Sequence, residues 1–138
     1  MDNKTSSLSG LKVLVVDDEE DVLTLTRQIL SLFGAEVITS PTAAKGLEQV
    51  QMQRPDAIIS DISMPHMDGY QFIQAVRNLP AHNGRDTPAM AVTAFNRPQD
   101  RARAFNSGFQ AHLSKPVSLN MLIETLAGIT NLPGNLHD

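Results

Sequence analysis

The sequence predicts a doubly wound α/β fold, in which a five-stranded parallel sheet carries helices on both faces. Five short, mostly apolar segments alternate along the chain with five segments whose apolar residues recur at helical spacing. The first short segment is apolar almost throughout, as expected of a strand that is covered on both faces. Each predicted strand is followed by a predicted helix, and parallel neighbours need such crossover connections.

The predicted strands are bounded by turn residues, prolines or clusters of charge. They cover residues 11–16, 35–39, 56–60, 88–92 and 109–113. The last of these alternates apolar and polar residues, which is the strand period of two.

The first predicted helix carries a single apolar stripe and ends at Gly34. The stripe consists of Val22, Leu25, Ile29 and Leu32. Ser40 and Pro41 supply an N-cap and a first-turn proline for the second helix, which ends before Pro55.

The remaining helices are predicted over residues 70–79 and 98–107, and after a capping Ser118. A flavodoxin-like strand order, 2-1-3-4-5, fits five such units. The alternative, a fragment of an eight-fold barrel, would need more chain than this. We expect a flexible lead over residues 1–10, one domain over 11–129 and a tail over 130–138.

Composition excludes several classes of function. The 138 residues include no cysteine, which removes disulfides, thiolate nucleophiles and cysteine-bound metals. Eleven Lys and Arg against fifteen Asp and Glu give a net charge of −4, which argues against a nucleic-acid or anionic-lipid surface. The longest purely apolar runs are four residues, so no membrane span is predicted, and the polar start is unlike a secretory signal. A cytoplasmic location is therefore expected.

Chemistry-bearing side chains follow four of the five predicted strands. They are Asp17 and Asp18 after the first, Asp61 after the third, Thr93 after the fourth and Lys115 after the fifth. In an open parallel sheet the ligand lies beyond the carboxyl ends of the strands, near the point where strand order reverses. The sequence therefore predicts that these five side chains converge.

Converging carboxylates repel one another, and a hard divalent cation with oxygen ligands, such as Mg²⁺, relieves that repulsion. A lysine and a hydroxyl in the same place suit phosphoryl oxygens. With no cysteine present, a carboxylate is the expected acceptor, and Asp61, alone after its strand, is the candidate for an aspartyl phosphate.

Four strings closely resemble the receiver domain of two-component response regulators. They are VLVVDDE (13–19), ISDISMPHMDG (59–69), AVTAF (91–95) and HLSKP (112–116). The resemblance implies that Asp61 takes a phosphoryl group from a phosphohistidine of a histidine kinase or phosphotransfer protein. It also implies that the domain is a signalling switch rather than an enzyme.

The resemblance further implies a ligand set for Mg²⁺, or Mn²⁺: Asp18, Asp61 and the backbone carbonyl of Ser63, with Asp17 acting through water. Lys115 would pair with the phosphoryl group, and its bond to Pro116 would be cis. Thr93 would carry the switch.

The sequence departs from the usual receiver pattern at two positions. His112 stands where relatives carry an aromatic residue that moves with the switch threonine, and its charge depends on pH. We expect the inward position of His112 to be disfavoured when it is protonated. Phe95 is bulky where polar residues are common, and together with the small Ser63 it is expected to set the access of water to the phosphate.

The sequence disfavours three other functions. Phosphatases that form an aspartyl phosphate usually carry D-x-D after one strand, whereas here the paired acids and the acceptor follow different strands. A receiver that acts without phosphorylation would lack an acid, Thr93 or Lys115, and all are present. In an FMN protein, these acids would repel the cofactor phosphate.

Relatives bind their downstream protein through the fourth helix, fifth strand and fifth helix, which here implies residues 98–127. The chain is expected to be a monomer or a phosphorylation-dependent dimer. The resemblance implies either a stand-alone receiver or the receiver of a hybrid histidine kinase.

Overall fold

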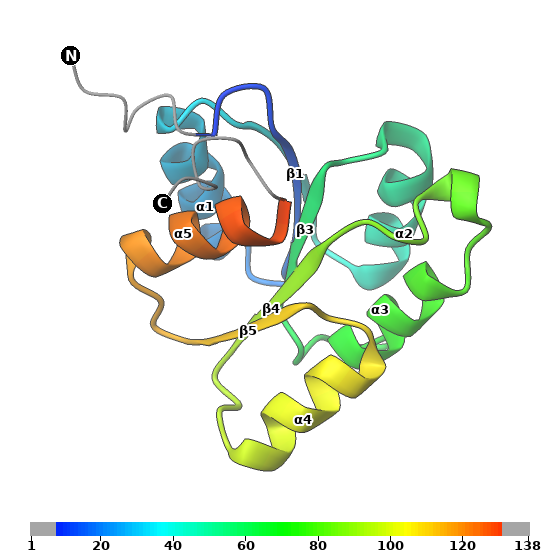
Figure 1. Ribbon diagram of the computed structural model, residues 1–138. Helices are drawn as coiled ribbons and strands as arrows, with labels where there is room; N and C mark the ends of the chain where they lie inside the picture. The colour runs from blue at the N-terminus through cyan, green and yellow to red at the C-terminus, as the bar shows by residue number, and fades with distance from the viewer. Residues whose placement is uncertain (1–7, 131–138) are drawn as a thin grey trace.

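The computed structural model describes residues 8–130, and its sheet has the predicted order β2-β1-β3-β4-β5 with all neighbours parallel (Figure 1). The strands are β1 (Lys12–Val16), β2 (Glu36–Ser40), β3 (Ala57–Ser60), β4 (Ala89–Thr93) and β5 (Ala111–Ser114). The flavodoxin-like doubly wound fold is therefore confirmed.

Helices cover both faces of the sheet, with α1 and α5 on one side and α2, α3 and α4 on the other (Figure 1). They are α1 (Glu20–Leu32), α2 (Ala43–Gln53), α3 (Gly69–Arg77), α4 (Pro98–Ser107) and α5 (Leu119–Thr130). A short 3-10 turn, η2 (Ala81–Asn83), lies in the loop before β4.

Two apolar cores result from this layering. Alternate β1 residues point to opposite faces, so Leu14 and Val16 belong to the core under α2 and α3, whereas Val13 and Val15 belong to the core under α1 and α5. Phe72 of α3 is completely buried in the first core. Burial on both faces explains why β1 is almost wholly apolar.

The prediction of which face of α1 is buried is wrong. Leu23 and Leu30 are the buried residues of this helix, while Leu25 and Leu32 of the predicted stripe are 57% and 70% exposed. The two pairs lie on neighbouring faces of one helix, and contact with the sheet decides between them.

The cap of α2 also differs from the prediction. Ser40 is the last residue of β2, and the side chain of Thr42 caps the helix by accepting a hydrogen bond from the Lys45 amide at 3.1 Å. The cap predicted for α5 is confirmed, because the Met121 amide donates to Ser118 Oγ at 3.1 Å.

The ends of the chain lie partly outside the described residues. Residues 8–10 form a turn before β1, and Leu8 in this turn is completely buried, with its amide donating to the Phe33 carbonyl at 2.8 Å. The described fold thus already includes Leu8. The predicted tail lies outside the described residues from 131 onward, and Thr130 ends α5.

Candidate functional site

Three carboxylates meet at the carboxyl edge of the sheet, where strand order reverses between β1 and β3. Asp17 and Asp18 follow β1 and Asp61 follows β3, and one carboxylate oxygen of each lies within 4.8 Å of the other two. Asp17 and Asp61 are buried, and Asp18 is exposed. The predicted convergence of the three acids is therefore present.

Backbone hydrogen bonds hold this arrangement. The Asp17 amide donates to the Ser40 carbonyl at 3.2 Å, and the Asp61 amide donates to the Val16 carbonyl at 2.9 Å. Both bonds continue the ladder of the sheet beyond the last strand residues. The carboxylates thus stand on a rigid strand edge rather than on a free loop.

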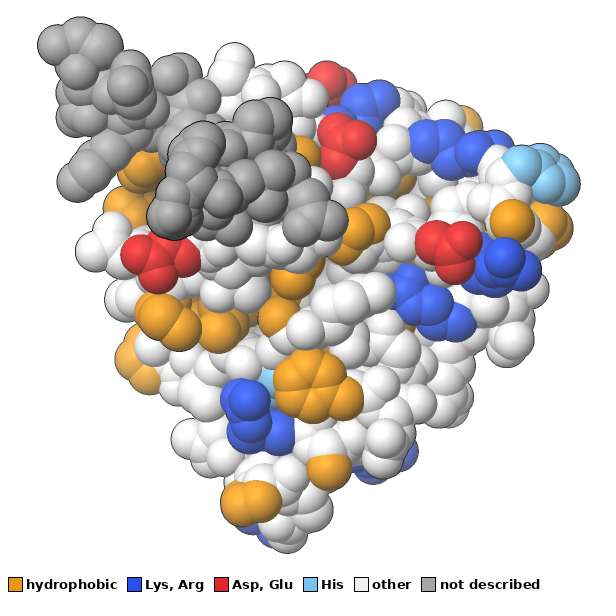
Figure 2. All heavy atoms as spheres, viewed as in Figure 1, with side chains coloured by type: hydrophobic (Ala, Val, Ile, Leu, Met, Phe, Trp, Pro, Cys, Tyr) orange, Lys and Arg blue, Asp and Glu red, His pale blue; other side chains and the backbone are white. Residues whose placement is uncertain are grey.

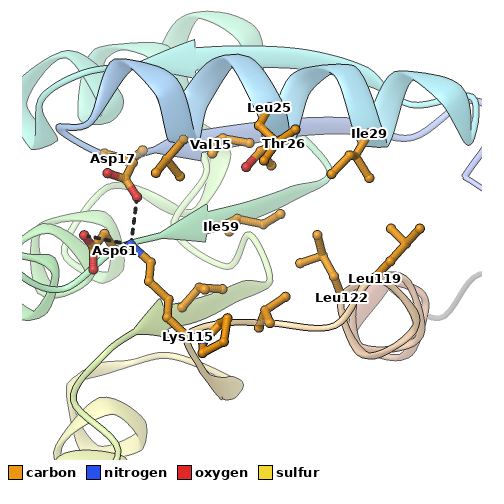
Figure 3. Close-up of a pocket in the computed structure, with 15 residues that line it drawn as sticks. Val15, Asp17, Leu25, Thr26, Ile29, Ile59, Asp61, Lys115, Leu119 and Leu122 are labelled. Carbon is orange, nitrogen blue, oxygen red and sulfur yellow. Dashed lines mark hydrogen bonds and ion pairs between the residues drawn. The ribbon is translucent and has the colours of Figure 1, made fainter.

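Each buried carboxylate is fixed through one oxygen and presents the other to Lys115. Asp17 Oδ1 accepts from the Glu19 amide at 2.9 Å, and Asp61 Oδ1 accepts from the Ile62 amide at 2.7 Å. Lys115 Nζ lies 3.3 Å from Asp17 Oδ2 and 3.4 Å from Asp61 Oδ2 (Figure 3). The ammonium group therefore bridges the two strand ends.

Lys115 reaches the acids from the end of β5. Its amide donates to the carbonyl of Thr93 at 2.9 Å, which joins the ends of β4 and β5. The peptide bond between Lys115 and Pro116 is cis, as expected from the family resemblance.

Opposing effects act on the charges of the site. Burial raises the pKa of Asp17, and the Asp61 charge adds to this, while the Glu19 amide and Lys115 oppose it. Burial acts to lower the pKa of Lys115, but attraction to Asp61 and Asp17 outweighs it, so this pKa lies above its usual value. The lysine is therefore positively charged and held in place.

The donor set fits a hard divalent cation. Three carboxylates supply only oxygen ligands, and one of them, Asp18, is exposed to solvent. Mg²⁺ prefers oxygen ligands and retains several waters, which an exposed edge allows. Asp17, Asp18 and Asp61 are thus the residues that could hold such an ion.

Thr93 and His112 lie beside this edge and are linked through one residue. Thr93 is buried, and its Oγ1 accepts from the Phe95 amide at 3.2 Å. His112 is also buried, and its Nε2 lies 3.0 Å from the carbonyl oxygen of Phe95. A carbonyl only accepts, so Nε2 carries the proton and donates.

Two predicted site residues lie in loops at the same edge. Ser63 is in the connection between β3 and α3, and its side chain is exposed. Phe95 follows β4, and it is 46% exposed although it is a large apolar residue. Both are thus accessible from solvent.

Sequence reasoning missed two features of this region. The Arg101 side chain donates through Nη1 to the His112 carbonyl at 3.1 Å, which ties α4 to β5. A cavity of about 580 Å³ between α1 and α5 opens beside Lys115. The sequence signal for the cavity is the apolar stripe of α1, which helical periodicity alone assigns to the core.

The fold and the site define a flavodoxin-like α/β domain with an acidic cluster and a lysine at its topological switch point. The response regulator receiver domain family matches residues 13–127. The chain belongs to this family of two-component signalling proteins.

Individual relatives agree with this assignment. An uncharacterized 14.6 kDa protein of Leptolyngbya boryana is 41% identical over 111 residues, which cover 80% of this chain and 83% of the relative. The sensor histidine kinase RcsC of Salmonella typhimurium is 33% identical over 91% of this chain, which spans 13% of RcsC.

A solved structure is similar over almost its whole length. Chemotaxis protein CheY4 of Vibrio cholerae superposes with a TM-score of 0.80 at 32% identity, covering 86% of this chain and 98% of CheY4. Among residues 8–130, no helix has the length and apolar character needed to cross a membrane.

Proposed function

We propose that this chain is a phosphoacceptor receiver in a two-component phosphorelay and that Asp61 is the acceptor. In the transfer, a carboxylate oxygen of Asp61 attacks the phosphorus of a phosphohistidine. The P–N bond breaks, an acyl phosphate forms, and the imidazole nitrogen of the donor takes up a proton. The supporting observation is that the backbone hydrogen bond of this buried carboxylate goes to Oδ1, which leaves Oδ2 facing Lys115 Nζ at 3.4 Å.

The other acids and the lysine would manage charge around Asp61. Asp17, Asp18, Asp61 and the carbonyl of Ser63 are the groups proposed to hold Mg²⁺ or Mn²⁺, with Asp17 acting through water. When bound, the cation would neutralise carboxylates and phosphoryl oxygens. Lys115 would turn from the carboxylates toward the phosphoryl oxygens. Beside the carboxylates it is already charged and partly buried.

The proposed phosphorelay is tested with acetyl phosphate and Mg²⁺. The intact mass of the chain should rise by one phosphoryl group, because the buried carboxylate needs only a donor and a cation. The Asp61→Asn variant should show no gain, and EDTA should abolish the gain of the wild type. An equal gain in Asp61→Asn, or one that EDTA leaves unchanged, would contradict the proposed acceptor or the metal dependence respectively.

We further propose that the switch passes through the backbone of Phe95. The amide of Phe95 is bound by Thr93 and its carbonyl by His112, so neither partner can move without changing this residue. If Thr93 turns to a phosphoryl oxygen, the Phe95 amide loses its acceptor. The change would then reach His112 and, through the His112 carbonyl, Arg101 on α4.

Protonation of His112 is expected to weaken this connection. Among residues 8–130, buried Nδ1 of His112 has no hydrogen-bond partner, so a proton there would be an unpaired charge. Asp100 of α4 is buried and near enough to His112 for their charges to interact, and the Arg101 side chain donates to the His112 carbonyl.

Replacing His112 with phenylalanine should remove the pH response of the loop after β4. In the wild type, amide resonances of residues 94–97 should change with pH, because a charge on the buried His112 ring would disturb its hydrogen bond to the Phe95 carbonyl. In His112→Phe these shifts should be absent, whereas His66→Phe, at an exposed histidine, should keep them. An unchanged titration in His112→Phe would contradict a role for this ring.

The proposed docking face for a downstream protein is made by α4, β5 and α5 over residues 98–127. Apolar side chains lie beside Lys and Arg side chains on the face that includes α4 (Figure 2). Phe105 and Met121 are 43% and 49% exposed, and the Arg101 guanidinium lies 5.7 Å from the Phe105 ring centre. Such a mixed surface suits a protein partner, and no direct nucleic-acid contact is proposed.

The setting of the domain is proposed from the same family. A histidine kinase or a phosphotransfer protein would supply the phosphoryl group in the cytoplasm, and the chain would act as a monomer or a phosphorylation-dependent dimer. We propose a domain over residues 11–129, to which the buried Leu8 of the preceding turn adds, either free-standing or within a hybrid kinase. Phe95 and Ser63 are proposed to set the lifetime of the phosphate by controlling water access.

A further inference from the structure

The cavity between α1 and α5 has a volume of about 580 Å³ and lies on the sheet face opposite α2, α3 and α4. Its floor is formed by Val15, Ile59 and Val92 from three adjacent strands. Pockets that hold small organic ligands are typically about 300–1,000 Å³ and mostly apolar. The space is therefore large enough for a small molecule.

The walls of this cavity are aliphatic side chains that the fold leaves partly uncovered. Leu25 and Ile29 project from α1, and Leu119 and Leu122 project from α5, toward the space between the helices (Figure 3). Leu25 is 57% exposed and Leu119 is 41% exposed. A ligand that covers such side chains removes apolar surface from water, which favours binding.

Polar groups occur at only a few points of the cavity. The Lys115 ammonium has three N–H groups, and within residues 8–130 it donates to Asp17 and Asp61. One N–H thus remains for an acceptor. Thr26, whose hydroxyl can donate a hydrogen bond, also lines the wall.

Without a bound metal ion, the charges at this end disfavour an organic ion that would fill the cavity. Asp17, Asp18 and Asp61 carry three negative charges against the single positive charge of Lys115, which disfavours an anion. A cation would have to compete with Lys115 for the carboxylates. The aliphatic walls make burial of either charge costly.

We propose that the α1–α5 cavity binds an uncharged small molecule with an apolar body and one hydrogen-bond-accepting group. The body would contact Leu25, Ile29 and Leu119, and the acceptor would take the remaining N–H of Lys115 or the Thr26 hydroxyl. Because the Lys115 stem lines the cavity, occupancy would be linked to the phosphoacceptor edge. Binding itself does not depend on phosphorylation of Asp61.

The test is a fluorescence titration with 2-naphthol, which has an apolar body and a neutral hydroxyl, on the unphosphorylated full chain. The chain contains no tryptophan, so its own emission interferes little. Naphthalene-2-sulfonate and 2-(aminomethyl)naphthalene present the same body with a negative or a positive charge. We expect saturable 2-naphthol binding and at least about tenfold weaker binding of both ions.

Matched variants locate the site. Thr26→Phe fills the cavity from its wall and should weaken 2-naphthol binding at least about tenfold, because the apolar volume is lost. Thr24→Phe, at an exposed position of the same helix, should change the affinity less than about twofold. Circular dichroism of both variants checks that the fold is intact.

Three outcomes would overturn the proposal. One is no saturable binding of 2-naphthol, and another is equal binding by wild type and a folded Thr26→Phe. The third is that a second copy of the chain occupies the cavity. Light scattering would then show a dimer of the wild type and a monomer of Thr26→Phe. None of these outcomes bears on whether Asp61 accepts a phosphoryl group, which the mass measurement decides separately.

Discussion

Replacing Lys115 with methionine is expected to slow phosphoryl uptake by Asp61 about 10²-fold, as when one charge-stabilising donor is lost from an active site. Within residues 8–130, the ion pairs of Asp17 and Asp61 are both made with Lys115. Methionine keeps the unbranched stem that lines the α1–α5 cavity but removes the charge. The rate of mass gain with acetyl phosphate and Mg²⁺ measures the effect.

Lys45→Met is the matched control for this prediction. Lys45 is exposed on α2, so the variant loses the same charge from the chain without touching the site. Its rate should stay within about twofold of the wild type, since isolated surface charges contribute little. A folded Lys115→Met variant that is phosphorylated as fast as Lys45→Met would contradict the role of the ammonium group.

Replacing Gly69 with alanine is expected to lower the free energy of unfolding by about 3 kcal/mol, at the upper end of the cost of overpacking. A Cβ at this position would lie 2.4 Å from the Asp61 carbonyl oxygen and 2.7 Å from Ile62 Cα. Both are backbone atoms, which cannot rotate away. Relief would require moving the segment that carries Asp61 away from the start of α3.

The close approach at Gly69 is tied to a hydrogen bond. The Gly69 amide donates to the Ile62 carbonyl at 2.8 Å and so holds the first turn of α3 against the acceptor loop. We therefore expect Gly69→Ala to lose phosphoryl uptake as well as stability. Urea unfolding monitored by circular dichroism gives the free energy.

Gly128→Ala provides the contrast. Gly128 is an exposed residue within α5, and alanine there should stabilise the helix by up to about 1 kcal/mol. If the free energy of unfolding of Gly69→Ala lies within about 0.5 kcal/mol of the wild-type value, the steric argument is wrong. Substitutions at ordinary surface positions already give changes of that size.

The acidic edge was predictable because its signal is local. Asp17 and Asp61 directly follow apolar strands, and the parallel topology brings the carboxyl ends of those strands together. Predicting that these carboxylates meet therefore needs no knowledge of loop conformation. In the structure, their oxygens lie within 4.8 Å of one another. The same logic placed Lys115 at the end of β5.

Features that depend on packing were not predictable in this way. Both Leu23 with Leu30 and Leu25 with Leu32 lie seven residues apart on α1, so helical periodicity alone does not distinguish them. Only contact with the sheet selects the first pair for burial. The second, exposed pair belongs to the stripe beside the cavity, which therefore had no separate sequence signal.

His112 illustrates a third kind of limit. Its alternation with apolar neighbours in β5 places it on one face of the strand. The alternation does not show which helix covers that face. Its burial and its hydrogen bond to the Phe95 carbonyl depend on how the loop after β4 folds back. Loop conformation is weakly encoded in a single sequence.

The most direct test of the account is to identify the residue that carries the phosphoryl group. Borohydride reduces an aspartyl phosphate to homoserine, so treatment of the phosphorylated chain followed by peptide sequencing marks the acceptor. The account predicts homoserine at position 61, with Asp17 and Asp18 unchanged. Homoserine at either of those two positions, or none in a chain whose mass shows phosphorylation, would contradict it.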